Sequence, residues 1–559
     1  MKNKILSKTI YEQWKYIFDL ANIIYIFQLI IRSNYPYNIK NNMSQNIYTY
    51  INIWLDGHMI TVESDTNHSV PTIDIIWLAD TAIKESKERI RSTFRRLNIK
   101  IPNIKFILNL APSDIRKTGT NFDLAMALAM LCNIHTDIYH RKLIEQWLFF
   151  GELGLDWEVK RINWLLPIIL SARSKWFKYF FVPADNIYEL EYVPDIYIFA
   201  ISNFSQIIDI FTHWQESEYI YNSKKLSDLN SVSSQWDIDF GHIKWQIVAK
   251  RSLSIAAAGL HNTLMVWAPG SGKTLMSRAL QSILPPLTND EILEVSQMYS
   301  IVGKLNKDIP LIIHRPFRNI HHTASKVSLV WWWANLQPWE ISLAHRGILF
   351  MDELTEFGRD TLDVLRQPLE DKKITISRAS GSVNYPADFM LVAAMNPCKC
   401  GFYKDPEKAC ICNIMDIKRY QSRISWPLLD RIDMILEIPR ENIDKLLERE
   451  TSHENSEQIR AKVIQAHNIQ QKRFIDTNIT NNSQISSKDI DKYIYMESRA
   501  EEFLKNGARK LILSPRVVHR IMKLARSIAD MDWSEHILLN HIAEAFQYRN
   551  KNMFIDENM

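Results

Sequence analysis

The segment LMVWAPGSGKTLM, residues 264–276, restricts the possible folds of this chain more than any other part of it. An apolar, strand-like run precedes Gly272, Lys273 and Thr274, and the helix-like SRALQSIL follows them. This is the order of a phosphate-binding loop, G-x-x-x-x-G-K-[ST], in which backbone N–H groups and the lysine hold phosphates and the hydroxyl binds Mg²⁺. We therefore predict an ATP-binding α/β domain with nucleotide contacts from Trp267, Ala268, Pro269, Gly270, Ser271, Gly272, Lys273 and Thr274.

A tryptophan, Trp267, stands where this loop has its first glycine. The position is a tight turn at the end of a strand, where a side chain is sterically costly. Average usage of about 7 % would give roughly 39 glycines, whereas the chain has 14 glycines beside 17 tryptophans. Tryptophan also follows Asp156, Pro338 and Asp532 in sequences typical of glycine turns. We hypothesise that the gene comes from a lineage that reads the UGA codon as Gly, translated here as Trp. The alternative is a Trp-rich paralogue with a degraded loop.

Two further strand-like runs end in polar residues that suit ATP hydrolysis. The run Gly347–Met351 is followed by Asp352 and Glu353, and the run Phe389–Met395 by Asn396. Hydrolysis needs charge neutralisation and an oriented water molecule. We assign Asp352, with Thr274, to Mg²⁺, Glu353 to general-base catalysis, and Asn396 to positioning the water. The alternatives are an ordinary strand end for the two acids and a turn residue for Asn396.

Length and composition indicate a soluble protein with several domains. The 559 residues exceed what one hydrophobic core supports. The 67 basic and 63 acidic residues give a net charge of +4, so a DNA site would have to be local. Five cysteines favour a reducing, cytoplasmic compartment. The apolar run 17–32 contains Asp19, Asn22 and Gln28 and is shorter than the about 20 residues of a membrane span, so we expect no membrane anchor.

Changes in pattern along the chain suggest five parts. Short β-like runs alternate with amphipathic helical patterns in two separate regions, which is typical of α/β domains. A polar, Ser-rich segment between these regions has the composition of a linker. We expect an extension at 1–47, with translation starting at Met43 as an alternative, an α/β domain at 48–198, a linker at 199–235, the ATPase domain at 236–440 and a helical domain at 441–559.

The order of several longer motifs resembles the magnesium-chelatase-type AAA+ ATPases, and within them the ComM/YifB-like group. The motifs are HRPFRNIHHTAS (314–325), EISLAHRGILFMDELTEF (340–357), RQPLEDKKITISRASGSV (366–383) and LLDRID (428–433). The resemblance implies a ring, expected to be a hexamer, with Arg431 as an arginine finger toward a neighbouring subunit and Arg516 as the second sensor on a helical lid. Arg423 is a second candidate for an intersubunit role. The alternative for each arginine is a surface or ion-paired residue.

The resemblance also implies a Lon-protease-like domain (S5 domain 2-like fold) before the motor. A protease of that type needs a nucleophilic serine and a lysine base. This chain has Asn121 and Leu166 where those residues would fall, and Ser113 is more simply a turn or cap residue. We therefore expect this domain to be a non-proteolytic scaffold or partner-binding element.

DNA is the substrate implied by the resemblance, and branch migration in recombination or natural transformation is the implied activity. Lys372, Lys373 and Arg378 lie in an expected β-hairpin, where they would hold phosphates without reading sequence. The alternative is a solvated charged hairpin. Two alternatives to the activity remain: the ATPase subunit of a metal chelatase, and a scaffold that hydrolyses no ATP if Trp267 is genuine.

Four cysteines follow Asn396 within a short distance, as Cys398-Lys-Cys400 and Cys410-Ile-Cys412. Four thiolates this close could complete a tetrahedral Zn²⁺ site. The usual structural pairs are C-x-x-C, however, and the alternative is four reduced thiols. Cys132 lies in the apolar LAMLC and is expected in a core.

The recoding hypothesis makes a prediction about the protein in its native cell. The family pattern has glycine at a set of positions where this chain has tryptophan: Trp54, Trp77, Trp157, Trp164, Trp176, Trp245, Trp267, Trp331, Trp332, Trp333, Trp339, Trp426 and Trp533. The tryptic peptide 252–273 from native protein should have the mass of a peptide with Gly at 267. A mass with Trp there would favour the scaffold reading.

Overall fold

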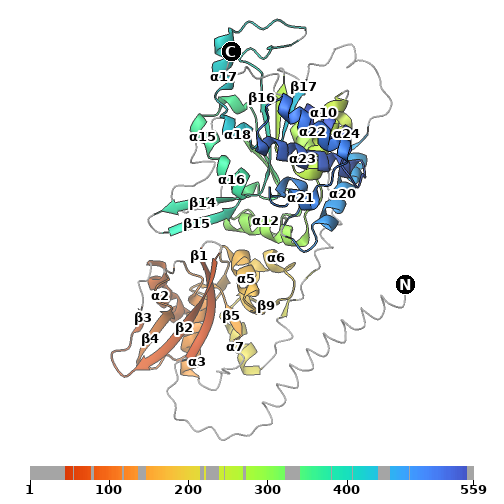
Figure 1. Cartoon of the computed structure of the whole chain (residues 1–559). Coiled ribbons are helices and arrows are strands. Elements are labelled where there is room, and N and C mark those ends of the chain that lie inside the picture. The colour runs from red at the N-terminus through yellow and green to blue at the C-terminus, as the bar shows by residue number, and fades with distance from the viewer. Residues whose placement is uncertain are drawn as a thin grey trace, which may run out of the picture. The chain divides into compact units, whose positions relative to one another are not determined.

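The computed structural model describes the chain from residue 45 to residue 549 with gaps (Figure 1). The described residues are 45–53, 56–76, 81–115, 117, 119–135, 146–213, 220–221, 224, 238–243, 246–267, 272–321, 340–378, 381–405, 407–438, 454–477 and 479–549. The expected extension therefore lies almost entirely outside them, as do most of the expected linker and the apolar run 17–32. No helix in these ranges is long and apolar enough to cross a membrane.

The first part is an α/β domain built on one mixed sheet. Its strands lie in the order β10-β9-β8-β5-β1-β2-β4-β3, with β1, β5, β8 and β9 parallel in succession. The elements are β1 Gln45–Ile53, β2 Asp56–Asn67, β3 Ile73–Ile76, α2 Thr81–Arg96, β4 Lys105–Ala111, α3 Asp123–Ile134, β5 Trp147–Phe149, β6 Glu152–Leu153, β7 Val159–Lys160, α5 Leu165–Ser174, β8 Tyr179–Pro183, η1 Ala184–Asn186, α6 Ile187–Leu190, β9 Tyr197–Ile201, α7 Phe204–His213 and β10 Ile220–Tyr221.

This domain extends beyond the expected boundary at residue 198. Helix α7 buries Phe204, Ile207 and Ile210 in the same core as α3, and β10 pairs with β9. The core explains why α3 is apolar on all sides: every residue from Asp123 to Cys132 is buried, and Cys132 is a core residue as expected. The start of the expected linker is thus part of this sheet.

The second part is a five-stranded parallel sheet in the order β12-β13-β16-β11-β17. Its central strands are almost entirely apolar, as expected for strands covered on both faces. The elements are η2 Phe240–His242, α10 Ile247–Gly259, β11 Thr263–Trp267, α11 Lys273–Ile283, α12 Asn289–Ile301, β12 Phe317–Ile320, α14 Glu340–Leu343, β13 Ile348–Met351, η3 Leu354–Glu356, α15 Arg359–Asp363, α16 Arg366–Asp371, β14 Lys373–Arg378, β15 Gly381–Pro386, β16 Met390–Met395, α17 Ile414–Gln421, α18 Trp426–Leu429 and β17 Met434–Ile438.

The C-terminal part is helical, as expected. It consists of α20 Ser456–Arg473, η4 Asn482–Gln484, α21 Ile490–Tyr493, α22 Ser498–Lys510, α23 Pro515–Met531 and α24 Leu539–Gln547. Its apolar residues share one core with α10 and with β11 of the parallel sheet, so these helices pack directly on the motor domain. The helix expected in residues 441–450 lies outside the described residues.

The backbone at several tryptophans is that of glycine. Of the tryptophans at glycine positions, Trp157, Trp164, Trp176 and Trp533 have φ values of 64°, 66°, 73° and 54°. This left-handed region is costly for residues with a Cβ atom and is routine for glycine. Trp157, Trp164, Trp176, Trp267, Trp426 and Trp533 are the members of the set within the described residues. The conformation supports the recoding hypothesis on grounds independent of composition.

Two of these tryptophans occupy the glycine position of a helix C-terminal motif. After α23, Trp533 N–H donates to the Asp530 carbonyl (3.3 Å) and Ser534 N–H to the Ala529 carbonyl (2.8 Å). After α5, Trp176 has the equivalent bond to the Arg173 carbonyl at 3.0 Å. This is the Schellman pattern, whose left-handed residue is usually glycine. Both indoles are largely exposed, at 65 % for Trp533 and 88 % for Trp176, so neither has packing to offset the strain.

Replacing these residues with glycine should therefore distinguish tryptophans that strain the backbone from tryptophans that the fold requires. We expect Trp533→Gly to raise the free energy of unfolding by about 1 kcal/mol, because left-handed strain is removed and no buried contact is lost. The matched control is Trp147→Gly: Trp147 is 3 % exposed and packs against Phe181 and Phe199. That variant should lose about 3–5 kcal/mol. Urea unfolding measures both, and a destabilised Trp533→Gly would contradict the strain argument.

Candidate functional site

The predicted nucleotide-binding residues that the structure describes meet at the carboxyl edge of the parallel sheet. Strand β11 leads to the loop, β13 to Asp352 and Glu353, and β16 to Asn396. Because β16 lies between β11 and β13, all three strand ends face the same place. Ligands of open parallel sheets bind at this edge, where neighbouring connections diverge.

Two side-chain contacts join the predicted site residues at this edge. Lys273 Nζ donates a short hydrogen bond to Asn396 Oδ1, and Thr274 Oγ1 lies 3.3 Å from Asp352 Oδ2. Burial lowers the pKa of Lys273 to about 8, although Asp352 and Glu353 oppose the shift. A desolvated ammonium group whose described hydrogen bond goes to a neutral amide is well suited to receive phosphate oxygens.

Among the described residues of the predicted site, all except Trp267 fit ATP with Mg²⁺. Gly272 has φ +84° and open space where a Cβ would stand, so the loop can turn there before α11 begins. Thr274 and Asp352 offer the oxygen ligands that Mg²⁺ prefers. Trp267 ends β11, and Ala268, Pro269, Gly270 and Ser271 lie outside the described residues. With glycine at position 267, every described residue of the site would fit ATP with Mg²⁺.

The two predicted arginines lie together at the opposite edge of the sheet. Arg431 comes just before β17, and its guanidinium makes a short ion pair with Glu370 of α16. Arg516, in the first turn of α23, binds the other oxygen of Glu370 at 2.9 Å. Glu370 was missed by sequence reasoning, since nothing in its local pattern marks it. Arg423 lies apart from these two arginines: it donates to the Thr355 carbonyl (2.8 Å) and forms an ion pair with Glu356 (3.2 Å).

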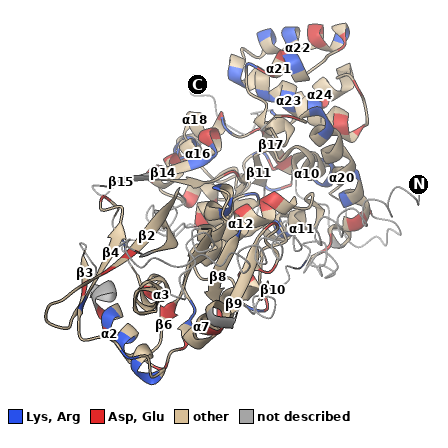
Figure 2. Cartoon of the chain, turned by 90° about the horizontal axis from the view of Figure 1, so that it is seen from below, with Lys and Arg blue, Asp and Glu red and all other residues tan. Residues whose placement is uncertain are grey.

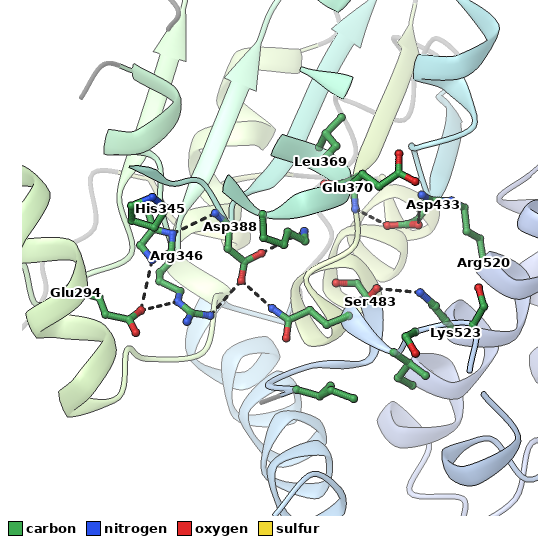
Figure 3. Close-up of a pocket in the computed structure, with 18 of the residues that line it drawn as sticks. Glu294, His345, Arg346, Leu369, Glu370, Asp388, Asp433, Ser483, Arg520 and Lys523 are labelled. Atoms are coloured by element: carbon green, nitrogen blue, oxygen red, sulfur yellow. Dashed lines mark hydrogen bonds and ion pairs between the residues drawn. The ribbon is translucent and has the colours of Figure 1, made fainter. Parts of the chain in front are cut away.

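A cavity of about 880 Å³ lies at this same amino-terminal edge (Figure 3). Asn262, Arg346, Asp388 and Asp433 line it, each shortly before one of the parallel strands. Burial alone would raise the pKa of Asp388, but ion pairs with Lys372 (3.1 Å) and Arg346 (3.0 Å) lower it. Among the lining residues, Arg346 is paired with Glu294 and Asp388, Arg520 is paired with Asp433, and Lys523 donates to the Ser483 carbonyl. We interpret the cavity as a seam between the sheet and the C-terminal helices.

Two of the predicted DNA-binding residues, Lys373 and Arg378, lie on one hairpin, and the third, Lys372, precedes it. β14 and β15 form the expected hairpin, with Lys373 opposite Pro386 at its base and Arg378 opposite Gly381 at its tip. Lys373 is exposed. Lys372 precedes the hairpin and is held by Asp388, so it lines the cavity instead of following the strands.

In the first domain, Leu166, which we predict at the position of the protease lysine, is fully buried in α5. Asn121, predicted at the position of the nucleophile, lies just before α3. A lysine missed by sequence reasoning lies nearby: Lys117 is fully buried and donates to the carbonyls of Pro112 and Ile115. Burial lowers the pKa of Lys117 to about 8. Both of the hydrogen bonds given above for Lys117 go to backbone carbonyls. The absence of proteolytic activity stays a prediction.

Comparison with known proteins places this geometry in a family. Models of the magnesium chelatase subunit ChlI match residues 62–186 and 239–446, and a model of the C-terminal part of that subunit matches 453–549. The chain is 34 % identical to competence protein ComM of Haemophilus influenzae over 510 residues, which cover 90 % of this chain and 97 % of ComM. The chain belongs to the ComM/YifB-like family of magnesium-chelatase-type proteins. It is also 33 % identical to YifB of Salmonella typhimurium over 508 residues, 90 % of this chain and 96 % of YifB.

Membership makes the chain an AAA+ ATPase of this family, for which ATP and Mg²⁺ are the implied ligands. The residues predicted to contact phosphate and metal lie together at the carboxyl edge, with Lys273 bonded to Asn396 and Thr274 beside Asp352.

Proposed function

We propose that this protein is a ring-forming motor that uses ATP hydrolysis to move along DNA, and that it drives branch migration during recombination of incoming strands in the cytoplasm. The observation that supports a ring best is the separation of the ATP site from the arginines that would complete it. Similarity to a protein named for competence supports the link to natural transformation.

The separation follows from the strand directions. Thr263, at the start of β11, pairs with Met434 at the start of β17, and Arg431 precedes that pair by three residues. The phosphate loop begins after Trp267, at the far end of β11. At about 3.3 Å per residue the strand alone separates the two edges by about 13 Å. Arg431 and Arg516 therefore lie at the edge of the sheet opposite their own Lys273, which supports a role toward a neighbouring subunit.

Hydrolysis at such an interface would divide its tasks between two chains. Glu353 is positioned after β13 to take a proton from water, and Asn396 after β16 to orient that water. Bound Mg²⁺ supplies charge neutralisation at the outer phosphates. Arg431 of the neighbour would stabilise the developing charge. In the isolated chain Glu370 pairs with both arginines, and its side chain is 46 % exposed, so an incoming phosphate can replace it.

Mixing two inactive chains tests the shared site. All chains carry Trp267→Gly to restore the loop. Glu353→Gln removes the base, and Arg431→Ala removes the arginine, so each alone should bind ATP without turnover. In a random equal mixture about one quarter of the sites combine an intact Glu353 with an intact neighbouring Arg431, and ATPase activity should return in proportion.

The matched control for this mixture replaces Arg431→Ala with Lys273→Ala. Glu353→Gln and Lys273→Ala damage the same side of the interface, so that mixture should stay inactive. No recovery in the first mixture, with mixed rings verified by size and mass, would show that Arg431 does not act across subunits.

The hairpin β14-β15 is the DNA-contacting element in this proposal. Lys373 is exposed at its base and Arg378 lies at its tip, next to the turn. Figure 2 shows Lys and Arg also concentrated on α2 of the first domain, which offers a second surface for the same strand. Such contacts bind the phosphate backbone without reading sequence.

Charge reversal on the hairpin should separate DNA binding from ATP hydrolysis. In the Trp267→Gly chain, Lys373→Glu with Arg378→Glu should abolish stimulation of ATPase activity by forked DNA. The slope of log K for DNA binding against log salt concentration should become smaller in magnitude by about two. Basal turnover should persist. The control reverses two exposed residues of α22, Arg509 and Lys510. Unchanged DNA affinity and salt slope in the hairpin variant would contradict the assignment, and stimulation by a chelatase partner in place of DNA would favour the chelatase alternative.

A further inference from the structure

The segment between β16 and α17 lacks the features that normally order a loop. Residues 396–413 contain no helix or strand among their described positions, and Ile411 is 88 % exposed. Irregular segments of this length are uncommon in compact domains unless they are functional or fixed by another constraint. Here the constraint is a cluster of four thiols.

The four sulfur atoms lie at the separations of a mononuclear tetrahedral site. Cys398 Sγ is 3.3 Å from Cys400 Sγ and 3.7 Å from Cys410 Sγ, and the last two are 3.5 Å apart. With Cys412, all four ligand atoms lie within 4.8 Å of one another. Zn–S bonds of about 2.3 Å in a tetrahedron require sulfur separations of about 3.8 Å. The cysteines are free thiols, so disulfide bonds do not account for the cluster.

The surroundings of the sulfurs are those of metal-bound thiolates. Backbone N–H groups of Gly401 and Tyr403 donate to Cys398, and Cys412 N–H lies 3.4 Å from Cys410 Sγ. Gly401 turns the first pair at φ +83° and donates to the Cys398 carbonyl at 3.0 Å, which lets a C-x-C pair converge. A set of four sulfurs without oxygen ligands selects Zn²⁺ over Mg²⁺ or Ca²⁺. An iron–sulfur cluster would spread the four thiolates over separate iron atoms.

One end of the segment adjoins the predicted ATP site, and the helix that follows the other end packs back on the first. At one end, Pro397 connects Cys398 to Asn396, which receives the Lys273 hydrogen bond. At the other end, Gln421 of α17 donates to the Pro397 carbonyl at 2.9 Å and closes the loop. A metal ion at the four sulfurs would thus fix the position of Asn396.

We propose that Cys398, Cys400, Cys410 and Cys412 bind one structural zinc ion per chain, and that this ion acts as a positioning element for Asn396. The metal site stands on the sulfur geometry alone. Its role in hydrolysis rests on the proposed function.

Metal content tests the site without reference to activity. The purified full-length chain should contain close to one zinc per chain by mass spectrometry of the elements, and a thiol-modifying mercurial should release it. Cys410→Ser with Cys412→Ser should lose the metal, whereas Cys132→Ser, a buried core cysteine of another domain, should keep it. Less than one-tenth zinc per chain after expression with added zinc would overturn the site, and an equal amount of iron would overturn the identity of the metal. If the double variant does not fold, mercurial titration of the unmodified chain gives the same answer.

The positioning role has its own readout. In the Trp267→Gly background, loss of the metal should lower kcat at least tenfold and leave ATP affinity within about threefold, because Asn396 orients the water while Lys273 still binds phosphate. Full kcat in a zinc-free chain would overturn the positioning role and leave the metal site standing. An inactive Trp267→Gly parent that contains zinc would count against the proposed ATPase instead.

Discussion

The parallel pairing of β11 with β16 on one side and β17 on the other is the constraint on which both halves of the site depend. Parallel strands send all their carboxyl ends to one edge, so Lys273 and Asn396 meet there although 123 residues separate them. The same pairing sends the residues before β17, including Arg431, to the other edge. One chain thus has its predicted ATP-binding residues at one edge and its two predicted arginines at the other, and in the ring that we propose a completed site would use two chains.

Glu370 allows the two arginines to lie close together at one edge of a single chain. Two arginines on one surface repel each other, and the shared carboxylate of Glu370 offsets part of that repulsion. The arrangement is tied to the sheet by a second pair, in which Arg520, one turn after Arg516 on α23, binds Asp433 directly before β17. Movement of the C-terminal helices relative to the sheet would therefore disturb the contacts of both arginines together.

The elements that carry local signals were predictable from the sequence, and the contacts between distant elements were not. The apolar runs ending at Met351 and Met395 and the helix after the loop are confirmed, because each follows from periodicity and end residues. The pairing of Glu370 with Arg431 and Arg516 spans 61 and 146 residues and depends on how α16 and α23 pack. Lys372 looked like its neighbour Lys373, but a left-handed turn at φ 58° directs it to Asp388.

The conformation of the tryptophans bears on whether Trp267 indicates a loss of ATPase function. A loop degraded after loss of ATPase function would change at the loop and leave remote turns intact. Instead the same residue occupies glycine conformations in a hairpin turn at Trp157, before a helix at Trp164 and after helices at Trp176 and Trp533. These places lie in two domains and share no ligand or partner in the described structure. A single change in decoding accounts for all of them, and it applies equally to Trp267, so the tryptophan in the loop is no evidence that the motor has been lost.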